Sequence, residues 1–241
     1  MTRSIKWGVV LLGLCFTVLT VSSCKKAPEE APQAQATQKQ ADQVALPIVL
    51  PAPKFAGTPG SLEGVTNLEA PLGHDRPPLL APRGATNVAL HKSVTSSSTE
   101  PILGTLAMIT DGNKDAIEGN LVELDPMPQW ITIDLGSPYE LYAVLFWHYH
   151  QQERAYRDVI VQVSNDPDFI EFQTFFNNDD DNSVGQGIGS DKNYVETNEG
   201  KLIDLVKTKV TGQYVRLYSN GNNQNELNHY LEVEVYGRPV Q

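Results

Sequence analysis

Cysteine is scarce in this 241-residue chain: there are only two, and both lie within the first 24 residues. If the chain is processed at the second of them, Cys24, one cysteine is left and no intramolecular disulfide can form. The rest of the chain has no thiol nucleophile, which excludes cysteine-based catalysis there.

Positive charge is also in short supply. The chain has 18 Lys and Arg against 29 Asp and Glu, which gives a formal net charge of −11. The imbalance is concentrated in residues 85–241, where 23 acidic residues stand against 10 basic ones. Nucleic acids and anionic polysaccharides need a basic surface, so neither is expected as the main partner. Cations and neutral ligands suit this composition better.

Familiar catalytic motifs are missing as well. The sequence contains no P-loop, no H-E-x-x-H and no G-x-S-x-G. The stretch GQGIGS lacks the glycine spacing of a dinucleotide fingerprint. Glycoside hydrolases use two carboxylates that meet in space, but no pair stands out among the many acidic residues here. The sequence therefore predicts that the protein is not an enzyme and has no catalytic residues.

The first 23 residues have the features of a secretory signal. Two basic residues precede an apolar stretch that ends near Thr20 and predicts a signal peptide, not a membrane span. The sequence VSSC that ends at Cys24 resembles a bacterial lipobox, in which the cysteine is lipidated and becomes the first residue. This implies a lipid-anchored protein of the bacterial cell envelope, and Lys25 favours the outer membrane. An ordinary signal peptide or an uncleaved anchor is the alternative.

Residues 24–84 predict a tether rich in Pro, Ala and Gln. Residues 25–43 have too few aromatic and branched aliphatic side chains to fold alone. From 44 to 84, prolines recur between apolar residues, which predicts an extended segment that docks partly on the following domain. As flexible coil, the tether would span on the order of 45 Å. That length is enough to hold a domain clear of a membrane.

Residues 85–241 predict a single domain made of short strands. Period-two alternation places Ile131 and Ile133 on one face, and the stretches DVIVQVSND, YVRLYSNG and YLEVEVYG alternate in the same way. No long stretch has helical periodicity. The pattern predicts an all-β fold, a single antiparallel β-sandwich or jelly roll. The strand positions of Asp134 and Arg216 further predict a cross-strand ion pair.

Six motifs in this domain, taken in order, resemble the discoidin, or coagulation-factor C-type, domain. They are NVALHKSVTSSS, ITDGNK, WITIDLGSPYEL, VIVQVSND, GQYVRLYSNG and EVEVYG, and they extend from about Ala85 to Gly237. The resemblance implies a galactose-binding-like β-sandwich, a fold shared with many carbohydrate-binding modules. It is less specific for the ligand, because members bind sugars, phospholipid head groups and proteins.

The resemblance also implies a structural Ca²⁺, which relatives hold with the DG loop and the first glutamate of the closing strand. The matching positions are Asp111 and Glu232, with backbone carbonyls near Asn113 and Ala116 completing a shell of hard oxygens. Relatives often have threonine in place of Ala116, a departure for which Asp115 would compensate. A plain turn beside a solvated glutamate is the alternative.

Loops at one end of the sandwich form the ligand rim in sugar-binding relatives, where they present His, Arg, Asn and an aromatic ring to a pyranose. The stretches FWHYHQQERAY and NGNNQNELNHY supply such residues here. Tyr149 or Tyr156 would stack on the sugar. The resemblance implies hydrogen bonds from six residues: His148, His150, Arg154, Asn222, Asn223 and Tyr230.

Other interpretations of these residues stay open. His148 and His150 could mark only the solvated end of a strand, or could chelate a transition metal with a third ligand such as His229. The acidic loop Asn177–Ser183 matches an EF-hand register poorly, so it either binds a second cation in another way or is simply solvated.

Together these features predict a lipid-anchored module that recognises a carbohydrate without catalysis and carries a structural Ca²⁺. The alternative is a protein–protein interaction or assembly module at the cell envelope, which would use the same loops over a flatter area. Contact with the membrane is expected only through the lipid anchor.

Overall fold

The computed structural model describes residues 42–240 of the chain. The predicted signal peptide (1–23), the predicted lipidation site Cys24 and the first part of the predicted tether (25–41) lie outside these residues. The secondary structure of the described part comprises β1 (Gln43–Ala45), β2 (Leu80–Pro82), β3 (Thr86–Asn87), β4 (Ser93–Ser96), the 3-10 helix η1 (Leu106–Thr110), β5 (Val122–Leu124), β6 (Gln129–Trp147), β7 (Ile160–Ser164), β8 (Gln173–Asn177), β9 (Lys201–Asp204), β10 (Thr211–Ser219), β11 (Asn228–Tyr230) and β12 (Glu232–Pro239). No helix within residues 42–240 is long and apolar enough to cross a membrane.

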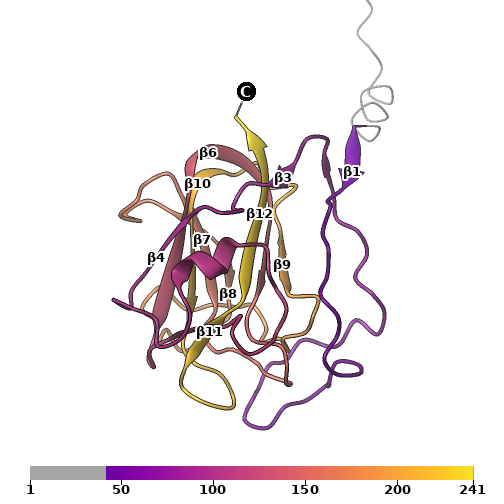
Figure 1. Cartoon of the computed structure of the whole chain (residues 1–241), viewed down its shortest axis with the longest axis vertical. Helices are drawn as coiled ribbons and strands as arrows, with labels where there is room; N and C mark the ends of the chain where they lie inside the picture. The colour runs from indigo at the N-terminus through magenta and orange to yellow at the C-terminus, as the bar shows by residue number, and fades with distance from the viewer. Residues whose placement is uncertain (1–41, 241) are drawn as a thin grey trace, which may run out of the picture. The chain divides into compact units, whose positions relative to one another are not determined.

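Strand β6 connects the two layers of the sandwich (Figure 1). Its first half, up to Asp134, pairs antiparallel with β4 and β10, and its second half, from Tyr139, pairs antiparallel with β12 and β9. The start of β10 also pairs with Tyr139 and Glu140, just beyond the bend. The chain bends between the halves at Gly136, whose φ of +83° is a conformation that other residues rarely adopt. The main sheet has the order β3-β12-β6-β10-β7-β8. The predicted all-β antiparallel sandwich is confirmed.

The main core lies between the two layers and has the predicted alternation. Ile131 and Ile133 of β6 are fully buried in it, together with Val215 and Leu217 of β10. Burying a large aliphatic side chain stabilises a fold by about 1.5–3 kcal/mol, so the repeated pattern is enough to fix which strand face points inward.

The predicted ion pair between Asp134 and Arg216 is wrong. Arg216 lies opposite Thr132, and its Nε donates to Thr132 Oγ1 at 2.7 Å. The guanidinium carbon lies 4.4 Å from the ring centroid of Trp130 and 3.8 Å from that of Phe169. A planar guanidinium stacks well on aromatic faces, and the two rings on the solvent side of the sheet offer that partner in place of the carboxylate.

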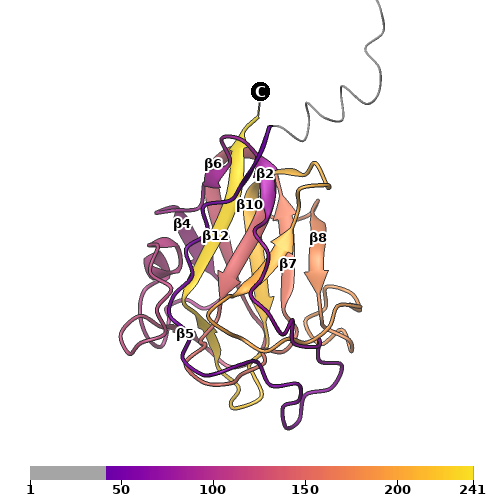
Figure 2. The same ribbon diagram turned by 90° about the vertical axis from the view of Figure 1, so that its right-hand side faces the viewer.

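Residues 42–84, which we call the N-terminal strap, pack along the outer face of the layer that contains β12 (Figure 2). Strands β1 and β2 pair within the strap. Leu46 and Ala81 are buried against Tyr142 and Tyr236, which point outward from β6 and β12. The segment that the sequence predicts to be an extended, partly docked tether thus covers an apolar sheet face.

The antiparallel pairing brings one set of loops to the same end of the sandwich. The C-terminal ends of β6, β8 and β10 and the N-terminal ends of β7, β9 and β12 all lie at this end, which is at the bottom of Figures 1 and 2. The strap also turns back there, between β1 and β2. Loops that are far apart in the sequence are therefore neighbours at this end.

Candidate functional site

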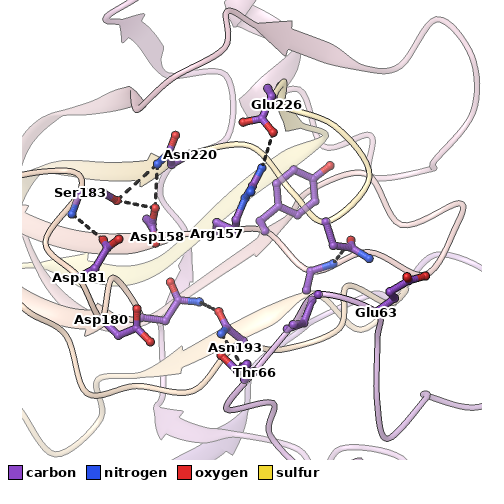
Figure 3. Close-up of a pocket in the computed structure, with 16 residues that line it drawn as sticks. Glu63, Thr66, Arg157, Asp158, Asp180, Asp181, Ser183, Asn193, Asn220 and Glu226 are labelled. Carbon is purple, nitrogen blue, oxygen red and sulfur yellow. Dashed lines mark hydrogen bonds and ion pairs between the residues drawn. The ribbon is translucent and has the colours of Figure 1, made fainter.

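A pocket of about 440 Å³ opens at the loop end of the sandwich (Figure 3). Its wall is built by strap residues 63–66, the loop 155–158 before β7, the acidic loop after β8, and residues of the 220–226 loop after β10. Asn193, in the loop before β9, completes it. Three loops and the strap meet at the pocket, because the acidic segment after β8 and Asn193 belong to the same connection between β8 and β9, so the pocket exists only in the folded protein.

Backbone hydrogen bonds hold the loop before β7 against the loop after β10. Arg157 N donates to Gly221 O at 3.0 Å, and Asn220 N donates to Arg157 O at 2.9 Å. Asn223 N donates to Ala155 O at 3.1 Å, while Asn223 Oδ1 accepts from Ala155 N at 3.0 Å. This short ladder fixes the positions of Arg157, Asn220 and Asn223, so little conformational freedom would be lost when they bind a ligand.

Three carboxylates meet at one side of the pocket. Oxygens of Asp158, Asp179 and Asp181 lie within 4.8 Å of one another. Asp158 Oδ2 accepts from Ser183 Oγ at 2.7 Å and from Asn220 Nδ2 at 2.8 Å (Figure 3). Burial raises the pKa of Asp158, and the charges of Asp179 and Asp181 add to this, while hydrogen bonds from Ser183 lower the pKa of Asp181. Asp158, from the loop before β7, thus adds a third carboxylate to the two from the acidic loop.

The pocket lining is acidic and rich in hydrogen-bonding groups. Its charged side chains are the carboxylates of five residues and one guanidinium, that of Arg157, which is paired with Glu226 at 3.0 Å. Tyr156 is the one aromatic residue among those that line the pocket, and its side chain is fully buried. The lining therefore offers amides, hydroxyls and carboxylates and no exposed ring for stacking.

His148 does not lie on an exposed rim, as the sequence predicted, but inside the protein. Its ring is fully buried and stacks on Tyr156 at a centroid distance of 4.2 Å. His148 Nδ1 lies 2.7 Å from Glu196 Oε1, and Glu196 is buried as well. The contacts of His148 thus tie β6 to the loop before β9, and no face of its ring is open to a ligand.

Three further residues of the predicted rim are buried. His150 Nε2 lies 3.0 Å from the carbonyl oxygen of Lys114, and Tyr230 Oη lies 3.1 Å from Ser219 Oγ. Asn222 donates to Leu227 O at 3.1 Å and so shapes the loop after β10. These side chains hold the loops in place from within the protein; the buried Nδ1 of His150 has no hydrogen-bond partner within residues 42–240.

The two remaining residues of the predicted rim lie at or near the surface. Asn223 lines the pocket. The guanidinium carbon of Arg154 lies 4.9 Å from the ring centroid of Tyr149 and is partly exposed. The structure therefore brings one of the six predicted residues, Asn223, into the pocket and places Arg154 close to it in the chain.

The histidines do not converge on a transition-metal site. His229 Nδ1 lies 2.9 Å from Tyr156 Oη, and its Nε2 lies 3.1 Å from Glu123 Oε2. Burial, with the nearby charges of Arg154 and His148, lowers the pKa of His229 to about 3. Among residues 42–240, the one group of three or more ligand side chains is the acidic cluster described above, so the interpretation of His148, His150 and His229 as a metal site is wrong.

Two of the predicted calcium residues, Asp111 and Glu232, lie near each other where the loop after η1 meets the start of β12. Glu232 is fully buried; its Oε2 accepts from Gly112 N at 3.0 Å, while its Oε1 has no hydrogen-bond partner. Gly112 has a φ of +89°, which turns the loop toward this carboxylate. Burial raises the pKa of Glu232 to about 8, and the nearby carboxylates of Glu234 and Asp111 contribute to that shift.

The model of the F5/8 type C domain matches residues 93–233, more than half of the chain. The chain belongs to the F5/8 type C domain family. The predicted discoidin resemblance is therefore confirmed. No curated protein matches the chain.

Several solved structures are similar to the chain at low identity. CpGH89CBM32-4 of Clostridium perfringens, in complex with GlcNAc-α-1,4-galactose, is 17% identical over 65% of this chain and 97% of its own, with a TM-score of 0.46. A Streptococcus pneumoniae fucose-binding module is 22% identical over 63% and 97% of the two chains, with a TM-score of 0.43. A family 89 glycoside hydrolase from C. perfringens is 18% identical, with a TM-score of 0.46; the match covers 64% of this chain but only 15% of the enzyme.

The match to the F5/8 type C domain begins after the strap has ended, so the pocket is only partly built by this domain. Residues 63–66 of the strap lie outside the matched range. Sequence reasoning also missed Asp158 and Asn220, because each is a single polar residue next to a strand. Two short sequence signals mark these positions. They are the turn dipeptide NG at Asn220 and the charged dipeptide RD at Asp158, just before β7.

Proposed function

We propose that the chain is a non-catalytic binding module that recognises a carbohydrate in the pocket between the strap and the loop end of the F5/8 type C domain. The observation that carries this proposal is the pocket itself. Its volume of about 440 Å³ is that of a small-ligand site, for which about 300–1,000 Å³ is usual. Its lining of amide, hydroxyl, guanidinium and carboxylate groups matches the hydrogen-bonding needs of sugar hydroxyls.

The division of roles follows from the contacts. Arg157 and Asn223 have N–H groups at the pocket and would donate to sugar oxygens, while Asn220 Nδ2 donates to Asp158 and Ser183 and holds that side of the pocket in place. Asp158 and Asp181 have only oxygens and would accept from sugar hydroxyls when ionised. The ladder fixes the backbone of the two loops that carry Arg157, Asp158, Asn220 and Asn223 before binding, so part of the ordering cost is already met in the folded chain.

The structural Ca²⁺ is part of the same proposal. The buried Oε1 of Glu232 without a partner and the nearby carboxylate of Asp111 fit a hard cation. The carbonyl oxygens of Asn113 and Ala116, in the loop after η1, would be the further ligands. A bound Ca²⁺ would supply positive charge that offsets the burial of Glu232 and would tie the loop after η1 to β12.

The proposal places the module at the bacterial cell envelope, lipid-anchored through Cys24 at the outer membrane. Its support is the lipobox-like sequence VSSC and the strap, which continues from the anchor side of the chain directly onto the domain. Equal membrane retention of a Cys24→Ala variant would contradict the anchor.

A glycan array probed with the full chain in Ca²⁺ tests the binding function. We expect binding to a defined sugar that Arg157→Ala and Asn220→Ala each weaken by roughly ten-fold or more, because the first removes donors at the pocket and the second removes the amide that holds Asp158 in position. Arg83→Ala is the matched control, since Arg83 is an exposed arginine outside the pocket lining. Absence of binding to a broad array would overturn the proposal and direct the search to a protein partner at the cell envelope.

A further inference from the structure

The charge of the pocket indicates which sugars it selects. Five carboxylates and one guanidinium line it, a formal charge of −4 on the lining. The guanidinium of Arg157 is paired with Glu226 at 3.0 Å, which leaves four acidic side chains of the lining without a cation: Glu63, Asp158, Asp180 and Asp181. Within residues 42–240, none of these four forms an ion pair.

The acidic groups are concentrated where Asp158 and Asp181 face each other across Ser183 (Figure 3). Asp158 Oδ2 receives two hydrogen bonds, from Ser183 and Asn220, whereas no donor within residues 42–240 reaches its Oδ1. The raised pKa of Asp158, caused by burial and then by Asp179 and Asp181, agrees with a shortage of positive charge at this point. A cation held here would relieve the repulsion among the carboxylates.

Glu63 extends the same charge to the strap side of the pocket. It is exposed and lies in the segment 63–66, while Asp180 lies on the acidic loop. A ligand in the pocket would therefore meet carboxylates on both walls. Sugars that carry sulfate or carboxylate would be repelled from both sides.

We propose that the pocket selects glycans that carry a protonated amine, with the ammonium group of an amino sugar held between Asp158 and Asp181. This inference rests on the proposed carbohydrate-binding function. An ammonium has three N–H donors and no acceptor, which matches a wall of carboxylate oxygens. Hydrogen bonds between charged partners are roughly twice as strong as neutral ones. N-acetylation of the same sugar removes the charge and adds an acceptor.

Titration calorimetry of the full chain with a glucosamine tetramer and with its N-acetylated counterpart tests the inference. At low ionic strength we expect the free-amine tetramer to bind roughly ten-fold more tightly, and we expect the difference to shrink in 1 M salt, where the Debye length is about 3 Å. Asp181→Asn should abolish the preference; Asp181 is exposed, so the variant should remain folded. Asp168→Asn removes an equal charge at an exposed position outside the pocket lining and should leave the preference unchanged.

The possible outcomes separate this inference from the function on which it rests. Equal affinity for the two tetramers would overturn the amine preference while leaving carbohydrate binding in place. A preference that survives in Asp181→Asn would overturn the position of the ammonium. Stoichiometric binding of Ca²⁺ alone that Asp181→Asn abolishes, without any amine preference, would show that the carboxylates hold a metal ion. A chain that binds no sugar on the array would overturn both proposals.

Discussion

Asn193 joins the strap to the F5/8 type C domain through its side-chain amide, whose Nδ2 donates to Thr66 O at 2.8 Å. Asn193 N also donates to Asn67 O at 3.1 Å, and Glu69 N donates to Asn193 O at 2.8 Å. Nearby, Lys201 Nζ lies 2.9 Å from a carboxylate oxygen of Glu69. The strap wall of the pocket is therefore held by contacts with the loop before β9 and with Lys201, the first residue of β9.

We expect Asn193→Ala to loosen the strap wall of the pocket. The substitution removes two side-chain hydrogen bonds, the one to Thr66 O and the one that Asn193 Oδ1 accepts from Asn178 Nδ2 at 3.0 Å, and should lower the free energy of unfolding by about 2 kcal/mol. Hydrogen exchange of the amides near Thr66 should accelerate, and glycan affinity should fall roughly several-fold because the wall is less well placed.

Asn165→Ala is the control for the strap variant. Asn165 Nδ2 also donates to a backbone carbonyl, Thr211 O at 3.2 Å, but lies outside the pocket lining. It should change stability by a similar or smaller amount and leave glycan affinity unaltered. If Asn193→Ala and Asn165→Ala bind the glycan with equal affinity, the strap does not contribute to the site.

Replacing His148 should lower the free energy of unfolding, because the side chain is buried and does not line the pocket. His148→Ala creates a cavity beside Tyr156 and leaves Glu196 Oε1 without its 2.7 Å partner, while Glu196 Oε2 already has none. The expected loss is on the order of 3 kcal/mol, measured by urea unfolding. His74→Ala, at an exposed histidine, should stay within about 0.5 kcal/mol of the parent. Unchanged stability of His148→Ala with lost glycan binding would instead support the rim predicted from the sequence.

The fold could be predicted because its signals are local and repeated. Alternation in β6 and β10 identifies the inward face of each strand without knowledge of its partners. The ordered motifs then identify the family, which fixes the connection of the strands. The run LYAVLFW at the end of β6 held a further signal: a continuous apolar stretch predicts burial of both faces, and the strap does cover the outer face.

The site could not be predicted to the same degree, for a physical reason. Once both faces of β6 are buried, alternation no longer tells which side chain meets solvent, and His148 and His150 continue the buried stretch. The pocket also depends on the docking of residues 63–66, and the sequence of this segment does not indicate which part of the domain it packs against. Asn223 could be predicted because its loop is rich in polar turn residues. Asp158, Asn220 and Glu63 could not, because only the tertiary fold brings them to the pocket.

Calcium should raise the melting temperature of the full chain. An ion present at about 100 times its Kd contributes about 2.7 kcal/mol, which corresponds to a rise of roughly 5–10 °C for a domain of this size. Asp111→Asn should reduce the rise by weakening the site, and Asp168→Asn should not. Identical melting curves in chelator and in excess Ca²⁺ would count against the ion.

Without Ca²⁺, the burial of Glu232 should make stability fall as the pH rises. Its pKa is about 8 in the folded chain against an ordinary value of 4.5, so between these values the folded carboxyl keeps a proton that the unfolded chain has released. The stabilisation is complete below about pH 4.5 and is lost as the pH rises through 8, with a slope of at most about 1.4 kcal/mol per pH unit. Denaturant unfolding in chelator across this range measures it.

Two substitutions separate the effect of Glu232 from that of other acidic groups. Glu232→Gln cannot ionise, so this fall should disappear in chelator, whereas Glu171→Gln, at an exposed glutamate, should retain it. Excess Ca²⁺ should also remove the fall in the parent chain, because the ion binds the ionised carboxylate and offsets its charge. A parent chain whose stability rises with pH in chelator over this range, in a way that Glu232→Gln reverses, would mean that Glu232 is ionised in the folded protein without a metal.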